Sequence, residues 1–273
     1  MTYLRLLALP FLTLLIGLGA GAYGFRLYIG SLSFDSLEIS SDSLLQVDHS
    51  PFQAILDRHL KTEQADGINK FDYRNALADR DAVAAYVAGL EAIDPADLNS
   101  EEALAYWLNF YNAGMIHLIL QRGEFHSVFD DRVYHFLTDH FEVAGQALSL
   151  DKIENQVIRV LWDEPRIHYG LNCASLSCPN LQPIAFSGDT LDTQLDAAAY
   201  EYINHPRGVA GLQGRRVVVS EIFEWFKEDF GGSDRGIIDH IAQYAEGDLA
   251  ADLSDARRVR TQTYDWTLNI VTN

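Results

Sequence analysis

The chain has 273 residues, of which 48% are hydrophobic, so it is long enough and apolar enough to bury a substantial core. Lys and Arg total 20 against 39 Asp and Glu, which gives a formal net charge of −19. Such a chain repels phosphate backbones, and no basic stripe is evident along the sequence, so nucleic-acid binding is not expected.

The first thirty residues form an apolar segment with the plan of a secretory signal. Arg5 precedes the run LLALPFLTLLIGLGAGA, and Ala20-Gly21-Ala22 offers a cleavage site. The stretch Leu6–Tyr23 is also about long enough to cross a bilayer, so a cleaved signal peptide and an uncleaved membrane anchor both stay open. With Arg5 on the cytoplasmic side, either alternative places the globular part outside the cytoplasm, in the periplasm.

A Ser- and Asp-rich linker over 31–50 follows, and the remaining residues, 51–273, are predicted to form one domain. Helical spacing of apolar residues predicts helices over 50–62 and 79–91. The longest helix is predicted over about 100–121, with Ser100 as its cap. Because its body is apolar nearly all round, we expect it at the centre of the fold.

The second half of the chain mixes short strands and helices. INKFDY near residue 70 alternates like a strand, and Phe141–Leu150 predicts two strands joined at Gly145-Gln146. A helix capped by Ser149 or Asp151 follows. Further elements are predicted in chain order: a strand RIHYGL, a helix over 189–204, a strand over 215–220, a helix SEIFEWFKEDF, a helix over 234–245 and a closing strand TYDWTLNIV. This pattern predicts an α+β domain with a small, mostly antiparallel sheet.

Both cysteines lie in the stretch RIHYGLNCASLSCPN, residues 166–180. His168 precedes Cys173 by five residues, and Cys178 follows five residues later. An imidazole beside a thiol lowers the pKa of that thiol and favours the nucleophilic thiolate, so a catalytic pair is one interpretation. A Cys173–Cys178 disulfide and a zinc site built from the three side chains are the alternatives.

Three further polar positions accompany this stretch. Asn109 and Asn112 share a face of the central helix, where they either tie loops to the helix or line a substrate pocket. Glu154 either faces solvent or orients His168. Arg166 shares a face with His168 if RIHYGL is a strand, and it is a candidate substrate-binding residue with Asn109, Asn112 and Cys178.

Five motifs in the same order resemble the domain-of-unknown-function 547 family of bacteria and plants, between about Gly67 and Asn269. They are AYWLNFYNAGMIH, LSLDKIENQVIR, EPRIHYGLNCASLSCPNL, VSEIFEWFKEDF and YDWTLN. The resemblance implies a fold related to papain-type or transglutaminase-type thiol enzymes. It implies Cys173 as nucleophile, His168 as base and Glu154 as the group that orients the imidazole.

The sequence therefore predicts an exported or membrane-anchored protein with thiol chemistry. The expected reaction is acyl transfer or amide hydrolysis on a peptide-like or small-thiol, glutathione-like substrate, with no cofactor and no bound metal. The alternative is a non-catalytic binding module of the cell envelope, in which Cys173 and Cys178 form a disulfide.

Overall fold

The computed structural model describes residues 43–123 and 125–272, and in it the central helix is the element around which the others pack. Helix α5, Ser100–Arg122, is buried at every position from Glu102 to Ile116, as its apolar circumference predicts. The side chain of Asn99 caps it by accepting the N–H of Glu102 at 2.9 Å, so the prediction that Ser100 is the cap is wrong. Ser100 Oγ instead accepts the indole N–H of Trp162 at 3.1 Å.

Most of the elements between Ser50 and Gly170 are helices that cover α5. The elements are α2 (Ser50–His59), α3 (Tyr73–Ala76), α4 (Arg80–Glu91), α6 (Leu150–Lys152), the π-helical turn η7 (Ile153–Ile158), α7 (Arg159–Leu161) and α8 (Ile167–Gly170). Two antiparallel hairpins lie on this part, β1 (Leu60–Lys61) with β2 (Lys70–Phe71) and β3 (Phe141–Val143) with β4 (Gln146–Leu148). The second hairpin turns at Ala144 and Gly145, both with positive φ, close to the predicted turn.

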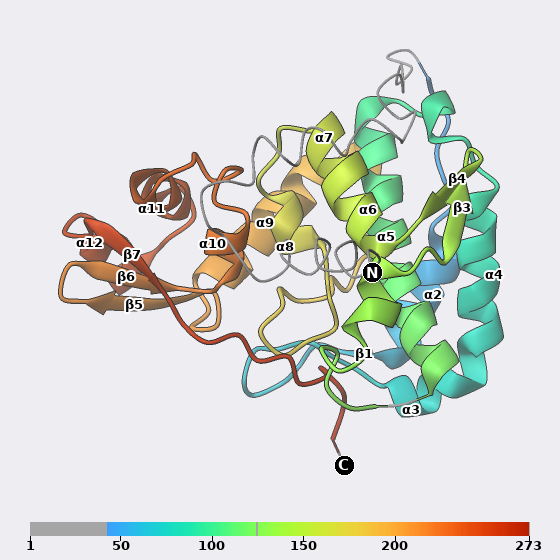
Figure 1. Ribbon diagram of the computed structural model, residues 1–273, viewed down its shortest axis with the longest axis horizontal. Coiled ribbons are helices and arrows are strands. Elements are labelled where there is room, and N and C mark those ends of the chain that lie inside the picture. Colours follow the sequence, from blue (N-terminus) through green and yellow to red (C-terminus); the bar gives the residue numbers. More distant parts are fainter. Residues whose placement is uncertain (1–42, 124, 273) are drawn as a thin grey trace, which may run out of the picture.

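The opposite end of the molecule carries a separate small sheet (Figure 1). Its strands are β5 (Val209–Gln213), β6 (Arg216–Val219) and β7 (Arg258–Thr261); β5 and β6 pair antiparallel, whereas β6 and β7 pair parallel. Helices α10 (Ile222–Trp225), α11 (Asp234–Ala242) and α12 (Gly247–Leu253) complete this end. The described chain therefore has three small sheets rather than the single, mostly antiparallel sheet predicted from the sequence.

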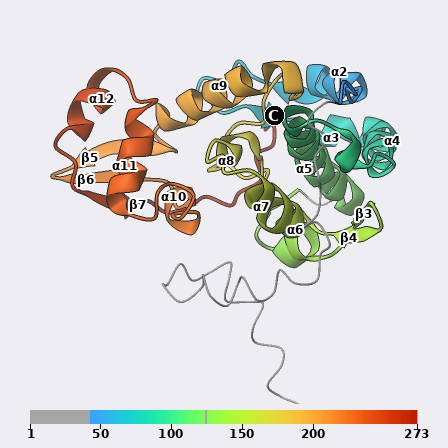
Figure 2. The same ribbon diagram turned by 90° about the horizontal axis from the view of Figure 1, so that it is seen from above.

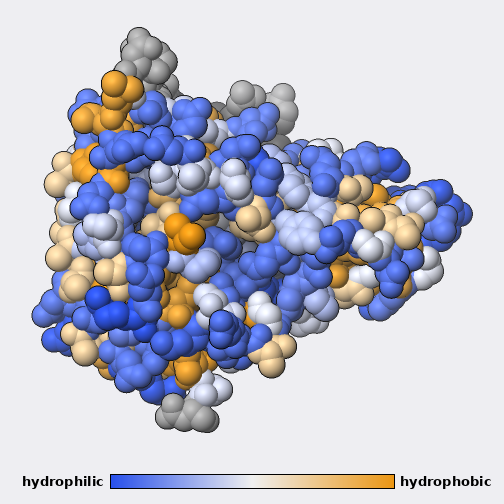
Figure 3. Space-filling view, turned by 180° about the vertical axis from the view of Figure 1, so that it is seen from behind, coloured by the Kyte–Doolittle hydropathy of each residue, from blue (hydrophilic) through white to orange (hydrophobic). Residues whose placement is uncertain are grey.

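Helix α9, Leu191–Ile203, joins the two ends (Figure 2). Leu191 and Leu195 pack in the hydrophobic core around α5, and Ala198 and Tyr202 pack in a second core beneath the sheet. The protein is thus an α+β fold with two hydrophobic cores, and α9 contributes residues to both of them. The face drawn in Figure 3 is largely hydrophilic, in keeping with the acidic composition.

Three other predictions about secondary structure are wrong. RIHYGL does not form a strand, because Ile167–Gly170 is a buried helical turn. SEIFEWFKEDF is helical only over Ile222–Trp225, and the following residues form turns. The segment after Tyr264 makes isolated bridges instead of a closing strand.

The predicted signal or anchor, residues 1–30, and most of the predicted linker lie outside the described residues. Among the helices of residues 43–123 and 125–272, none combines the length and hydrophobicity needed to cross a membrane.

Candidate active site around Cys173

The cysteine loop, residues 171–181, leaves α8 under the control of two asparagines. Asn112 on α5 accepts the N–H of Asn172 at 2.8 Å and donates to the carbonyl of Gly170 at 2.9 Å. The Asn172 side chain in turn accepts the N–H of Ala174 and donates to the carbonyl of Pro179. Both backbone ends of the loop are therefore fixed by amide side chains buried below 7% exposure.

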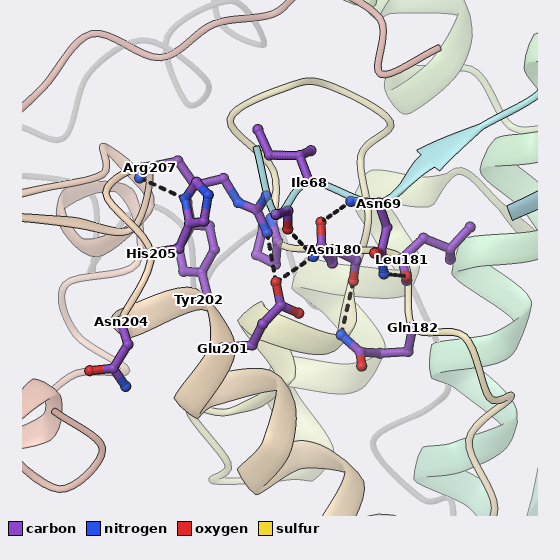
Figure 4. Close-up of polar contacts among 12 residues, drawn as sticks. Ile68, Asn69, Asn180, Leu181, Gln182, Glu201, Tyr202, Asn204, His205 and Arg207 are labelled. Atoms are coloured by element: carbon purple, nitrogen blue, oxygen red, sulfur yellow. Dashed lines mark hydrogen bonds and ion pairs between the residues drawn. The ribbon is translucent and has the colours of Figure 1, made fainter. Parts of the chain in front are cut away.

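The far end of the cysteine loop is held by Asn180, which lies between two other segments (Figure 4). Asn180 accepts the N–H of Asn69 at 2.8 Å and donates to the carbonyl of Gly67 and to the carboxylate of Glu201 on α9. Arg207 also donates to Glu201, at 3.1 Å. This network ties the loop to the β1–β2 hairpin and to α9.

The C-terminal segment completes the frame of the loop. The N–H of Leu176 donates to the carbonyl of Thr267 at 2.9 Å, and the N–H of Asn269 donates to the carbonyl of Ala174 at 2.7 Å. These backbone bonds bring Tyr264 beside the loop, although the two segments are about 90 residues apart in sequence.

Cys173 lies where the two hydrophobic cores meet, and the residue is half-buried. Its Sγ is 3.1 Å from the hydroxyl of Ser175 and 3.2 Å from that of Tyr264. Its backbone N–H donates to Sγ of Cys178 at 2.8 Å. Ala174 has φ of +64°, an unfavourable value for alanine, and this turn places Ser175 against the sulfur.

The surroundings of Cys173 favour its thiolate. Burial acts to raise the pKa of this thiol, but hydrogen bonds from Cys178, Ser175 and Tyr264 outweigh burial and lower the pKa to about 7. The neighbouring Cys178 is buried, and burial together with Cys173 raises the pKa of its thiol well above the usual value. The surroundings therefore favour ionisation of Cys173 and the protonated form of Cys178.

His168 lies on α8 with its ring between two carboxylates. Nε2 is 2.7 Å from Oδ2 of Asp229, and Nδ1 is 3.7 Å from Oε1 of Glu154. The ring also stacks on Phe226 at 4.0 Å between centroids. Glu154 therefore does approach His168. Within the described residues, however, no hydrogen bond joins the imidazole to the sulfur of Cys173 or to that of Cys178.

Asp229 is the common acceptor of this charged cluster. Arg159 on α7 binds it through Nε at 2.6 Å and Nη2 at 2.8 Å, and His168 donates to it as well. Burial acts to raise the pKa of the Asp229 carboxyl, but the bonds from His168 and Arg159 hold it well below its usual range. Asp229 is therefore ionised, and because a carboxylate only accepts, Nε2 of His168 carries the proton.

Glu154 belongs to the π-helical turn η7, a geometry that is frequent at functional sites. Asp151 lies one turn earlier, and burial, followed by the charge of Glu154, raises the pKa of its carboxyl to about 6. Tyr111 of α5 is buried, and both this carboxylate pair and the thiols act on its phenol. Burial raises the pKa of its phenol, as do the charges of Glu154 and of Cys173. Glu154 and Cys173 thus both act on the same buried tyrosine of α5.

The other predicted substrate-binding residues are engaged within the protein. Asn109 is fully buried, and its amide donates to the carbonyl of Phe186 and accepts the N–H of the same residue. Arg166 binds the carboxylates of Glu164 and Asp196 at 2.6 and 2.7 Å. These contacts agree with the interpretation that Asn109 and Asn112 tie loops to the central helix. Arg166, at the start of α8, holds that helix against α9 through Asp196.

Neither the disulfide nor the zinc alternative is realised in the described part of the chain. Cys173 and Cys178 are both free thiols. Among residues 43–123 and 125–272, no group of three His, Cys, Asp or Glu side chains is arranged to hold a metal ion.

Sequence reasoning missed the groups that surround the thiol and the imidazole. Ser175 and Tyr264 contact the sulfur, and Asp229 and Arg159 contact or support His168. A signal for all four was present, because each lies in one of the five motifs that carry the family resemblance. Arg159 ends LSLDKIENQVIR and Ser175 lies in EPRIHYGLNCASLSCPNL, whereas Asp229 lies in VSEIFEWFKEDF and Tyr264 begins YDWTLN. The motifs alone assign no role to these four side chains.

Comparison with known proteins adds one finding. Residues 95–203 match the model of the family described as "Protein of unknown function, DUF547". This confirms the family resemblance read from the motifs. The DUF547 segment runs from the approach to α5 through α9 and so contains Glu154, His168, Cys173 and Cys178, whereas Asp229 and Tyr264 lie beyond it. No curated protein and no solved structure matches the chain.

Proposed function

We propose that this protein is a thiol enzyme that transfers or hydrolyses an acyl group, with Cys173 as its nucleophile. One observation carries the proposal: where the two cores meet, Sγ of Cys173 lies within 3.1 Å of the Ser175 hydroxyl and 3.2 Å of the Tyr264 hydroxyl, contacts that stabilise a thiolate. Together with Cys178 they lower the pKa of this thiol to about 7 against the opposing effect of burial. Active-site groups are commonly perturbed in this way, whereas structural cysteines stay inert.

The reaction follows from the state of the sulfur. The Cys173 thiolate attacks the carbonyl carbon of an amide, a C–S bond forms, and the C–N bond breaks as the amine leaves with a proton. Water then hydrolyses the thioester, or a second amine takes the acyl group, and Cys173 is released as a thiol. Cys178 and Tyr264 hold protons next to the sulfur and are positioned to return one to the leaving amine.

The family resemblance implies His168 as the base and Glu154 as the group that orients its imidazole. The contact between Glu154 and His168 supports an orienting role for the carboxylate. However, both ring nitrogens face carboxylates, so the imidazole reaches the sulfur only by leaving Glu154 or Asp229. We therefore assign Cys173 as the catalytic residue and His168 as a positioning residue of the adjacent cluster.

We further propose export or anchoring through the apolar segment 1–30 and a peptide-like or glutathione-like substrate. The apolar run LLALPFLTLL after Arg5 supports export or anchoring. The hydrogen-bonded Cys173 thiolate, a nucleophile for amide carbonyls, supports the peptide-like or glutathione-like substrate. A fusion of residues 1–50 to a reporter that is active only outside the cytoplasm tests export.

Alkylation of the full-length chain with iodoacetamide across pH 5–9 tests the nucleophile. The wild type should show an inflection near pH 7, and Cys173→Ser should remove the fast reaction. Cys178→Ala should move the inflection upward, and His168→Ala should leave it in place. Turnover of peptidyl and γ-glutamyl anilides, with Cys173→Ser as the matched inactive variant, then tests catalysis. An inflection at the ordinary thiol value, near about 8.5, would contradict the proposal.

A further inference from the structure

Five arginines gather on the small sheet at the end of the molecule opposite α5 (Figure 1). They come from two short segments about forty residues apart, and all are exposed. We call them the arginine face: Arg215, Arg216, Arg257, Arg258 and Arg260. The two segments are separate in the sequence, and the parallel pairing of β6 with β7 brings them together.

The arginine face differs from the rest of the molecule in its partners. Elsewhere six arginines bind carboxylates at 2.6–3.1 Å: Arg58, Arg122, Arg159, Arg166, Arg207 and Arg235. On the arginine face, within the described residues, the one carboxylate contact is that of Arg258 with Asp234, at 3.8 Å. Arg260 donates to the neutral amide of Gln213, and Arg257 donates to backbone carbonyls. In a chain with 39 acidic residues, these guanidinium groups are left unneutralised.

The register of the strands sets like charges side by side. Arg216 on β6 is the direct partner of Arg258 on β7, and Arg260 lies two residues further along the same face. Adjacent like charges destabilise a sheet, so this arrangement costs stability unless an anion lies between them.

A hollow beside Arg216 and Arg260 offers room for such an anion. It has a volume of about 570 Å³ and is lined by Arg216, Glu224, Val259, Arg260 and Thr261. That volume is typical of small-ligand sites, which span roughly 300–1,000 Å³. The carboxylate of Glu224 is already bound by Lys227 at 3.3 Å, so it opposes an anion less than a free carboxylate would.

We propose that this hollow binds the phosphate group of a small ligand or of a lipid headgroup. Arg216 and Arg260 supply planar donor pairs that match phosphate oxygens, and the Thr261 hydroxyl supplies a neutral donor beside them. The remaining arginines of the face raise the local potential and draw the anion in against the net charge of the molecule. The site is independent of the thiol, because neither Arg216 nor Arg260 contacts Cys173.

The test uses the full-length chain in neutral detergent and pyrophosphate as the probe. Calorimetry at low salt should show binding, and pyrophosphate should raise the unfolding midpoint. Arg216→Ala and Arg260→Ala should each weaken binding at least tenfold, whereas Arg80→Ala, an exposed arginine on α4 far from the hollow, should not. Iodoacetamide reactivity of Cys173 should stay unchanged in all variants.

Flotation with vesicles distinguishes the two sources of phosphate. Extra binding to phosphatidylglycerol over phosphatidylcholine vesicles that is lost in Arg216→Ala and Arg260→Ala assigns a lipid headgroup. Pyrophosphate binding without that preference assigns a soluble phosphate ligand. The proposal is overturned if the wild type binds neither probe, or if all three arginine variants bind equally.

Discussion

At the scale of single residues, Tyr264 offers the clearest test of how the Cys173 thiolate is stabilised. Its hydroxyl lies 3.2 Å from the sulfur, and the hydrogen bond between them is one of three from side chains that lower the pKa of the thiol. A hydrogen bond to a charged group contributes about 1.5–3 kcal/mol, so Tyr264→Phe should raise the pKa of Cys173 from about 7 to about 8 or higher. The alkylation rate against pH measures this. Tyr200→Phe, at an exposed tyrosine, is the matched control; an unchanged inflection in Tyr264→Phe would mean that Ser175 and Cys178 suffice.

Asp151 gives a residue-scale prediction with a defined pH window. Burial and the charge of Glu154 raise the pKa of this carboxyl to about 6 in the folded protein, above its unfolded value of about 4. A raised folded pKa means that stability is lost as pH rises from about 4 through 6. Asp151→Asn removes this loss and should stabilise the protein by about 2 kcal/mol at pH 7–8, with no gain below pH 4. Urea unfolding at pH 4, 6 and 8 measures the difference. A gain that is equal at every pH would show that charge is not its cause.

At the scale of elements, two helical glycines form a matched pair. A Cβ at Gly89 on α4 would meet no atom within 4 Å, whereas a Cβ at Gly114 on α5 would lie 3.0 Å from the ring of Phe141. Gly89→Ala should therefore stabilise the protein by about 0.5–1 kcal/mol through backbone entropy. Gly114→Ala should instead destabilise it by about 1–2 kcal/mol, because the β3–β4 hairpin must move. Chemical denaturation of both variants tests the contrast, and equal gains would mean that α5 and this hairpin pack loosely.

Element prediction from sequence worked where periodicity was long and failed where it was short. Helix α5 could be located because its apolar run extends over about six turns and ends at Gly123, which has φ of +65°. RIHYGL misled because six residues fit a strand and a helical turn equally well, and all four residues of Ile167–Gly170 are buried. SEIFEWFKEDF has helical spacing, but after Trp225 its backbone folds into turns, and Asp229 reaches His168 from there.

At the scale of the whole molecule, the candidate site depends on contacts that no local pattern encodes. The sequence pointed to Cys173, His168 and Glu154, and the last two do lie together. Tyr264 and Asp229 reach the site from segments 91 and 61 residues away from their partners, through the C-terminal segment and the turns after α10. The arginine face was hidden for the same reason, since its two segments meet only through the β6–β7 pairing.

The two cores should unfold together, because both α8 and α9 belong to both of them. Ile167 packs with the core around α5, and Tyr169, on the same turn of helix, packs with the core beneath the sheet. Asp229 strengthens this junction from the sheet side by accepting from Arg159 and His168. Calorimetry should therefore show one transition.

Asp229→Asn tests the junction directly. It leaves a half-buried guanidinium and a buried imidazole without their anion, which should cost about 2 kcal/mol and lower the single midpoint by roughly 4–8 °C. The pKa of this carboxyl is depressed, so the stability it supplies is present above its unfolded value of about 4 and is lost as pH falls further. Wild type and variant should accordingly converge in acid. Asp196→Asn, which removes a half-exposed partner of Arg166, should cost less than about 1 kcal/mol. Two separate transitions, with only one shifted by Asp229→Asn, would show that the cores are independent and that Cys173 lies at a movable boundary between them.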